Sequence, residues 1–207
     1  MKTKLIAVLA SAAMLQANAG AAVDTFIRFH YATPINGIAI SGLGYAPSES
    51  QDPLARFGFM ELKDFSFGAE NPVSIGSSTS GAAVGKTKFN DFSITRSVDA
   101  ASPSLFKVLA AGAHFDYVDV ILRKSGGGGK ASTDPYLVYR FKSVYVSKVN
   151  WTSSDESPKE SVTMGFGGMI LQYRSQKPDG SLNTKVVASW SVIDGKAMDD
   201  ELIDLSH

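Results

Sequence analysis

Residues 92–124 read FSITRSVDAASPSLFKVLAAGAHFDYVDVILRK, an extended segment followed by one short helix and a second extended segment. Ser102 is a residue type that caps helices, and Pro103 suits the first helical position. One apolar helix face with a glycine stop follows at i, i+3, i+4 and i+7: Leu105, Val108, Leu109 and Gly112. We therefore predict about three helical turns that cover a sheet or the end of a barrel.

The rest of the chain has the composition of short β-strands separated by turns. The strand-like segments are residues 23–29, 57–67, 88–97, 136–149, 160–174 and 184–193, with residues 36–41 as a further candidate. The connections rich in glycine, proline or polar residues are residues 42–53, 76–85, 126–129 and 177–180. Strands spaced in this way predict a mainly β fold, an antiparallel sandwich or a closed barrel.

Three strand segments carry local features. In residues 118–123 the valines and the leucine share one face, opposite Asp119 and Arg123. In the strand over 136–149 the apolar positions change parity near Ser143, which predicts a bulge or bend. The glycines of residues 165–168 predict a bend or a close backbone approach in the next strand.

Composition places the chain among single globular domains. It has 207 residues, of which 44% are hydrophobic and 19% charged, enough to bury a substantial core. The 20 basic side chains equal the 20 acidic ones, so no overall field favours nucleic acid or acidic lipid as a partner. There is no cysteine, so stability must come from core packing or from assembly.

The N-terminal residues have the pattern of a secretory signal peptide. Lys2 and Lys4 precede an apolar run over residues 5–15, and small residues follow, with A-x-A patterns over 17–19 and 19–21. The apolar run is too short to span a bilayer as a permanent helix, and no later segment is suited to stable membrane insertion. We expect a secreted or periplasmic protein, unless translation starts at Met14.

We accordingly expect three segments. Residues 1–21 are the signal peptide, residues 22–195 the β domain, and residues 196–207 an acidic C-terminal tail. The composition of the tail is compatible with a marginal helix or a loose segment.

Two motifs suggest chemistry, and both have a simpler interpretation. SGAAVGKT, residues 80–87, resembles a phosphate-binding loop, but Ser80 replaces the first glycine and a strand-like segment follows where a helix is needed. His114 lies near Asp116 and Asp119, but no nucleophile-elbow pattern accompanies it. No metal-ligand spacing is present either, so we expect no enzyme activity, no cofactor and no metal.

The segment around the helix resembles the haemolysin-coregulated protein (Hcp) family. The most specific part is D-x-A-S-P-x-L followed by G-x-H, which the sequence carries as Asp99, Ser102, Pro103, Leu105, Gly112 and His114. Further similar segments are residues 22–27, 61–67, 92–95, 118–124, 160–166 and 173–180. The resemblance covers most of residues 22–190.

The resemblance implies a β-barrel of two antiparallel sheets flanked by one short helix. It also implies a structural protein of the type VI secretion system, which assembles with itself into hexameric rings that stack into a hollow tube. Sheath and spike proteins and small effectors are the further partners that it implies, and no catalytic residue is carried over.

The signal-peptide pattern departs from the family, whose members normally lack one. Three hypotheses therefore stand at this point. The first is a tube subunit or its exported paralogue. The second is a periplasmic or extracellular binding protein that uses an aromatic-lined loop surface. The third is an exported hydrolase built around His114.

Overall fold

The computed structural model describes residues 23–31, 37, 39–40, 42–43, 52–74, 83–124, 134–153 and 157–205. The elements in chain order are β1 (Val23–His30), a 3-10 turn η1 (Ala55–Phe57), β2 (Met60–Leu62), β3 (Asp64–Ser66), β4 (Ala69–Glu70), β5 (Val73–Ser74), β6 (Ala83–Val84), β7 (Lys88–Phe89), β8 (Phe92–Ser97), α1 (Ser102–Ala111), β9 (His114–Lys124), β10 (Leu137–Thr152), β11 (Lys159–Tyr173), β12 (Val186–Ser191) and β13 (Lys196–Ala197). The predicted signal peptide lies outside the described residues. None of the described helices has both the length and the apolar character needed to span a bilayer.

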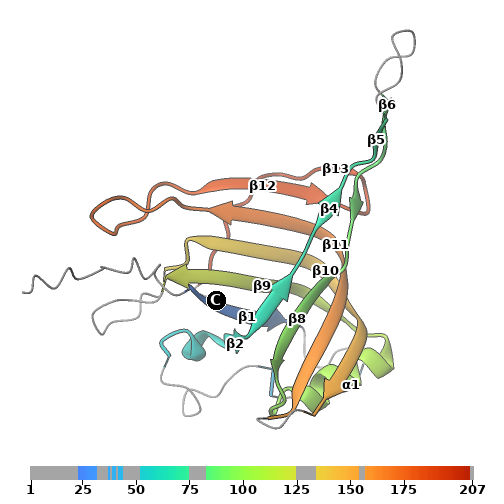
Figure 1. Cartoon of the computed structure of the whole chain (residues 1–207). Coiled ribbons are helices and arrows are strands. Elements are labelled where there is room, and N and C mark those ends of the chain that lie inside the picture. Colours follow the sequence, from blue (N-terminus) through green and yellow to red (C-terminus); the bar gives the residue numbers. More distant parts are fainter. Residues whose placement is uncertain are drawn as a thin grey trace, which may run out of the picture.

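The main sheet has nine strands and is antiparallel throughout. Its hydrogen-bonded order is β13-β12-β11-β10-β9-β1-β2, and β8 joins β11 to β3. Figure 1 shows that β10 and β11 are long, strongly bent strands that cross from one layer into the other. The first part of β11 pairs with β8 and its last part with β12. The predicted mainly β, antiparallel fold with one flanking short helix is confirmed.

The segment expected as one strand over 57–67 is divided. Gly58, with a φ of +79°, ends the turn η1, and Lys63 separates β2 from β3. β2 pairs with β1, whereas β3 pairs with β8, so this part of the chain connects two regions of the sheet. Of the candidate strand over 36–41, the described residues 37 and 39–40 form none.

The bend in β10 lies where the parity change predicts it. Ser143 has a positive φ of 51°, which few residues other than glycine adopt. Gly167 lies beside it on β11, where a Cβ atom would lie only 3.3 Å from the Cβ of Ser143. A shift of register follows between Val146 and Lys148. The close backbone approach at the glycines is thereby confirmed.

Two small hairpin sheets extend the chain between β3 and β8. β4 pairs with β7, and β5 pairs with β6 (Figure 1). Lys86 and Thr87 are followed by the strand β7, so the described part of SGAAVGKT lacks the helix that a phosphate loop needs. Residues 80–82 of this motif lie outside the described residues.

The main sheet is covered on both faces, and this gives the domain two apolar clusters. The larger cluster lies under α1, with Leu105, Val108 and Phe115 fully buried. The smaller one lies on the other face, where residues 54–59 and the C-terminal segment pack against Ile121.

The acidic C-terminal segment is neither a helix nor loose over its described residues. After β13 it crosses the sheet without forming a helix or a strand, and Ile203 is only 2% exposed within the smaller cluster. Ile203 is one of the apolar residues among the acidic ones, and its burial holds the segment down.

Candidate functional site

Asp99 and Ser102 order the start of α1 together. Ala101 is the N-cap and Ser102 the first helical residue, so the prediction of Ser102 as the cap is wrong by one position. The carboxylate of Asp99 accepts a hydrogen bond from the amide of Ala101 (2.8 Å). The hydroxyl of Ser102 accepts one from the amide of Asp99 (3.1 Å). Pro103 fits the first turn because amides there have no carbonyl partner within the helix.

The other residues of the motif fix the helix and its end. Leu105 is completely buried against the sheet. Gly112 adopts the left-handed conformation, with a φ of +60°, and ends α1 as predicted. His114 begins β9 and is exposed, with its ring stacked on Tyr145 at a centroid distance of 5.1 Å. The motif thus builds one structural corner.

A buried ion network connects this corner to the sheet. Arg96, only 2% exposed, donates to Glu160 (2.9 Å) and also pairs with Asp99. Glu160 is fully buried, and its other oxygen accepts a hydrogen bond from the indole nitrogen of Trp151 (3.1 Å). Because charged groups hold both Asp99 and Trp151, the start of α1 and the end of β10 are fixed relative to each other.

The result is an exposed apolar groove, which we call the helix-start surface. It has a volume of about 460 Å³ and is lined by Val98, Asp99, Ser102, Pro103, Phe106 and Trp151. Phe106 and Trp151 are 52% and 49% exposed, and their ring centroids lie 6.0 Å apart. Contiguous exposed apolar side chains on a rigid support are typical of protein interfaces.

A second exposed apolar region, the β12 edge, consists of Val186, Trp190 and Ile193. Their exposed fractions are 69%, 36% and 74%. β12 pairs along its length with β11, but on its other side only Trp190 and Ser191 pair with β13. Figure 1 shows β12, with the short β13 beside one end of it, on the side of the sheet away from α1.

A row of charged side chains crosses the sheet on the face opposite the main core. Arg28, Asp119 and Arg140 are register neighbours on β1, β9 and β10. Arg140 donates to both oxygens of Asp119 (2.7 and 2.9 Å), and Arg28 donates to one (3.2 Å). Burial alone would raise the pKa of Asp119, but the hydrogen bonds from Arg140 and the contact with His30, whose Nε2 lies 3.3 Å from the carboxylate, outweigh it and hold the pKa below its ordinary value.

This geometry leaves no support for a hydrolase around His114. Within the described residues, His114 makes no hydrogen bond to Asp116 or Asp119, and Asp119 is occupied by Arg28 and Arg140. The described part of the chain also holds no cluster of three or more potential metal ligands.

The comparisons with known proteins agree with the fold. The family model described as "Type VI secretion system effector, Hcp" matches residues 49–173. Protein hcp1 of Pseudomonas aeruginosa is 31% identical over 98 residues, which span 46% of this chain and 59% of that relative.

Solved structures extend the similarity over more of the chain. One described as a type six secretion system protein superposes with a TM-score of 0.67 at 22% identity, covering 86% of this chain and 100% of that one. Hcp1 from Salmonella typhimurium gives a TM-score of 0.59 at 21% identity, covering 86% and 99%. At such identities these structures establish the shared fold.

Proposed function

The chain belongs to the Hcp family of type VI secretion proteins, and on that premise we propose that it is a structural, non-enzymatic tube subunit that assembles with itself into hexameric rings. The observation that carries the proposal is the helix-start surface. Its exposed aromatic side chains are held by a buried ion network, although nothing in the described part of the chain covers them. A preorganised apolar surface of this kind loses little conformational entropy when a partner covers it.

A closed ring needs two different surfaces on each subunit, because each copy contacts its neighbours head to tail. The helix-start surface and the β12 edge supply such a pair, since they lie on different elements and both expose large apolar side chains. In the proposed ring, the helix-start surface of one copy packs against the β12 edge of the next. The rings then stack into a hollow tube, with sheath and spike proteins and small effectors as further partners.

The export pattern over residues 1–21 adds a second part to the proposal. A processed chain is secreted or periplasmic, and acts as an exported paralogue of the tube protein. N-terminal sequencing of the native protein tests this part. Export predicts a first residue at position 20 or 22, whereas Met1 or Met14 as the first residue contradicts it.

Native mass spectrometry of the purified chain tests ring assembly. The proposal predicts a species of six copies that Phe106→Ser depletes, because Phe106 is 52% exposed in the single chain. Burying this ring contributes about 1 kcal/mol at each interface, from about 1.5–3 kcal/mol for a fully buried side chain. Lys107→Ser is the matched control, since Lys107 is exposed on the same helix. A wild-type chain that stays monomeric at all concentrations refutes the proposal.

A further inference from the structure

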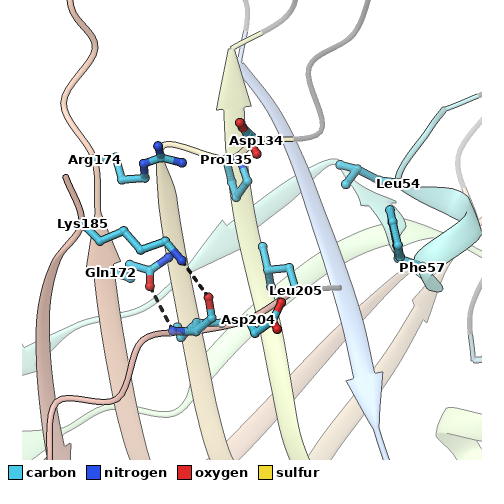
Figure 2. Close-up of a pocket in the computed structure, with 10 residues that line it drawn as sticks. Leu54, Phe57, Asp134, Pro135, Gln172, Arg174, Lys185, Asp204 and Leu205 are labelled. Atoms are coloured by element: carbon cyan, nitrogen blue, oxygen red, sulfur yellow. Dashed lines mark hydrogen bonds between the residues drawn. The ribbon is translucent and has the colours of Figure 1, made fainter. Parts of the chain in front are cut away.

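Residues 198–205 lie in a groove across the face of the sheet that is opposite the main core. Figure 2 shows this C-terminal groove, with Gln172 and Lys185 pointing toward the segment. The amide of Ile203 donates to the side-chain oxygen of Gln172 (3.0 Å). The side chain of Ile203 is buried in the smaller apolar cluster. One apolar anchor and one amide contact therefore fix the middle of the segment.

The main chain of the segment is held by three basic side chains. The carbonyl oxygens of residues 203–205 accept, in order, from Lys185 (3.1 Å), Arg140 (3.3 Å) and Arg28 (3.2 Å). The two arginines are held in place by Asp119 between them. These hydrogen bonds go to consecutive backbone carbonyls, which any peptide offers whatever its side chains. The preference for this segment comes from its anchor, the buried side chain of Ile203.

The charges of the segment and the groove are complementary. The segment contains Asp199, Asp200, Glu201 and Asp204, whereas the groove presents Arg28, Arg140, Lys142 and Lys185 against only two carboxylates of its own among the described residues, Asp119 and Asp134. Lys142 lies 3.7 Å from Glu201. A cavity of about 260 Å³ remains beside the segment, bounded by Phe57, Pro135 and Arg174 (Figure 2). The groove is thus larger than the segment that lies in it.

Before it reaches the groove, the segment is tied to its own sheet by β13 and by the hydroxyl of Ser189, which lies 2.8 Å from the carboxylate of Asp200 and 3.0 Å from the carbonyl oxygen of Met198. β13 has two residues, paired only with Trp190 and Ser191. All the groove contacts involve atoms that a second copy of the segment also carries. When two copies exchange identical segments, the contacts in each groove stay the same. The free-energy cost of the exchange therefore comes from losing the high effective concentration that a segment has near the groove of its own chain. A neighbouring copy in an assembly restores that concentration.

We propose that the C-terminal groove is a binding site for an extended acidic peptide, and that it accepts residues 198–205 of a second copy in exchange for the chain's own. This inference goes beyond the proposed tube function, and the exchange is also expected between copies that form no closed ring. The occupant is a segment of the same sequence, and it is recognised by its backbone, its acidic charge and the buried Ile203.

Cross-linking between two single-cysteine variants tests the exchange, because the chain has no cysteine of its own. Lys142→Cys places a thiol in the groove, and Glu201→Cys, on an isotope-labelled chain, places one on the segment. These side chains lie 3.7 Å apart and both are partly exposed, so replacing them costs little stability. A short bis-maleimide linker joins the thiols, and mass spectrometry identifies the mixed dimer.

Two controls make every outcome informative. The double variant Lys142→Cys/Glu201→Cys must link within one chain, and its failure to do so contradicts the docked geometry itself. Ser153→Cys, at the exposed position that follows β10, replaces Lys142→Cys to measure chance collisions.

We expect the yield of the mixed dimer to exceed the yield with Ser153→Cys about tenfold, because docking raises the local concentration of the two thiols. The mixed dimer should vanish when Ile203→Asp is added to the labelled chain. Circular dichroism checks that the Ile203→Asp chain keeps its fold. A mixed dimer at background level, while the double variant links within its chain, overturns the exchange.

Discussion

Replacing Asp119 with alanine tests the electrostatic account of the fold most sharply. Asp119 is fully buried and is the shared partner of Arg28 and Arg140. The side chain of Arg28 is only 5% exposed, so water cannot replace the lost carboxylate. The substitution leaves two cations side by side on one face of the sheet, and both hold carbonyl groups of the C-terminal segment.

The expected cost follows from this burial. Removing one partner of a buried ion pair destabilises a protein by about 3–5 kcal/mol, because the other charge stays buried without compensation. Two uncompensated cations place Asp119→Ala near the upper part of that range, at about 4 kcal/mol. For a domain of this size, such a loss lowers the melting temperature by about 8–16 °C.

Urea unfolding followed by circular dichroism measures the change in the free energy of unfolding. Asp116→Ala is the matched control, because Asp116 is exposed on the same strand β9 and its loss should change stability by no more than about 0.5 kcal/mol. If Asp119→Ala lowers the free energy of unfolding no more than Asp116→Ala does, the charged row does not stabilise the sheet.

The difference in the free energy of unfolding between the wild type and Asp119→Ala should decrease at acidic pH. The pKa of Asp119 is lower in the folded protein than its ordinary value. The carboxylate therefore stabilises the fold fully above the unfolded-state pKa, at about pH 4, and this contribution is lost as pH falls through the folded-state pKa. The difference in the free energy of unfolding between the wild type and Asp119→Ala should narrow as the pH falls below about 4.

Three further substitutions test the packing, each by thermal unfolding. Leu105→Ala removes a completely buried side chain under α1 and should cost about 2–5 kcal/mol, and a cost below about 1 kcal/mol would contradict its place in the core. Gly112→Ala should cost about 1–2 kcal/mol because its φ of +60° is unfavourable for other residues, and an unchanged melting temperature would argue against the left-handed helix end. Gly167→Val should cost about 1–3 kcal/mol, since a Cβ atom there lies 3.3 Å from the Cβ of Ser143, and a neutral effect would show that the strands are further apart.

The sequence predicts those parts of the fold that depend on the pattern of residues within a single helix or strand. The apolar spacing of Leu105 and its neighbours gives α1, and the alternation in residues 118–123 gives β9. The parity change at Ser143 predicts the bend of β10, because side chains on a strand alternate strictly unless the backbone is irregular. These signals lie within one element, so they can be found without knowing its partners.

The sequence does not show which charged residues lie inside. Asp119 and Arg140 are 21 positions apart, and only the pairing of β9 with β10 makes them neighbours. A charged residue that alternates with apolar residues along a strand usually points to solvent. The buried row becomes evident only when the register of the three strands places Arg28, Asp119 and Arg140 side by side. The acidic C-terminal segment misleads in the same way, because its many carboxylates hide the apolar residues Met198, Ile203 and Leu205, which pack on the sheet.

The start of α1 shows how a local motif can be assigned to the wrong residue. Asp99 and Ser102 are both good capping types, and their hydrogen bonds go to neighbouring amides of the same turn. The buried partner of Asp99, Arg96, is three residues earlier on β8 and gave no signal as part of the corner. The exposed surface formed by Phe106 and Trp151 was also missed, because β10 and α1 are brought together only by the fold.

Electron microscopy of the purified chain at high protein concentration shows whether the chain assembles with itself into rings. We expect hollow rings of six copies that stack end to end, and the loss of these rings in Phe106→Ser but not in Lys107→Ser. A field of single, separate molecules in the wild type, at a concentration where the chain is folded by circular dichroism, would contradict this expectation.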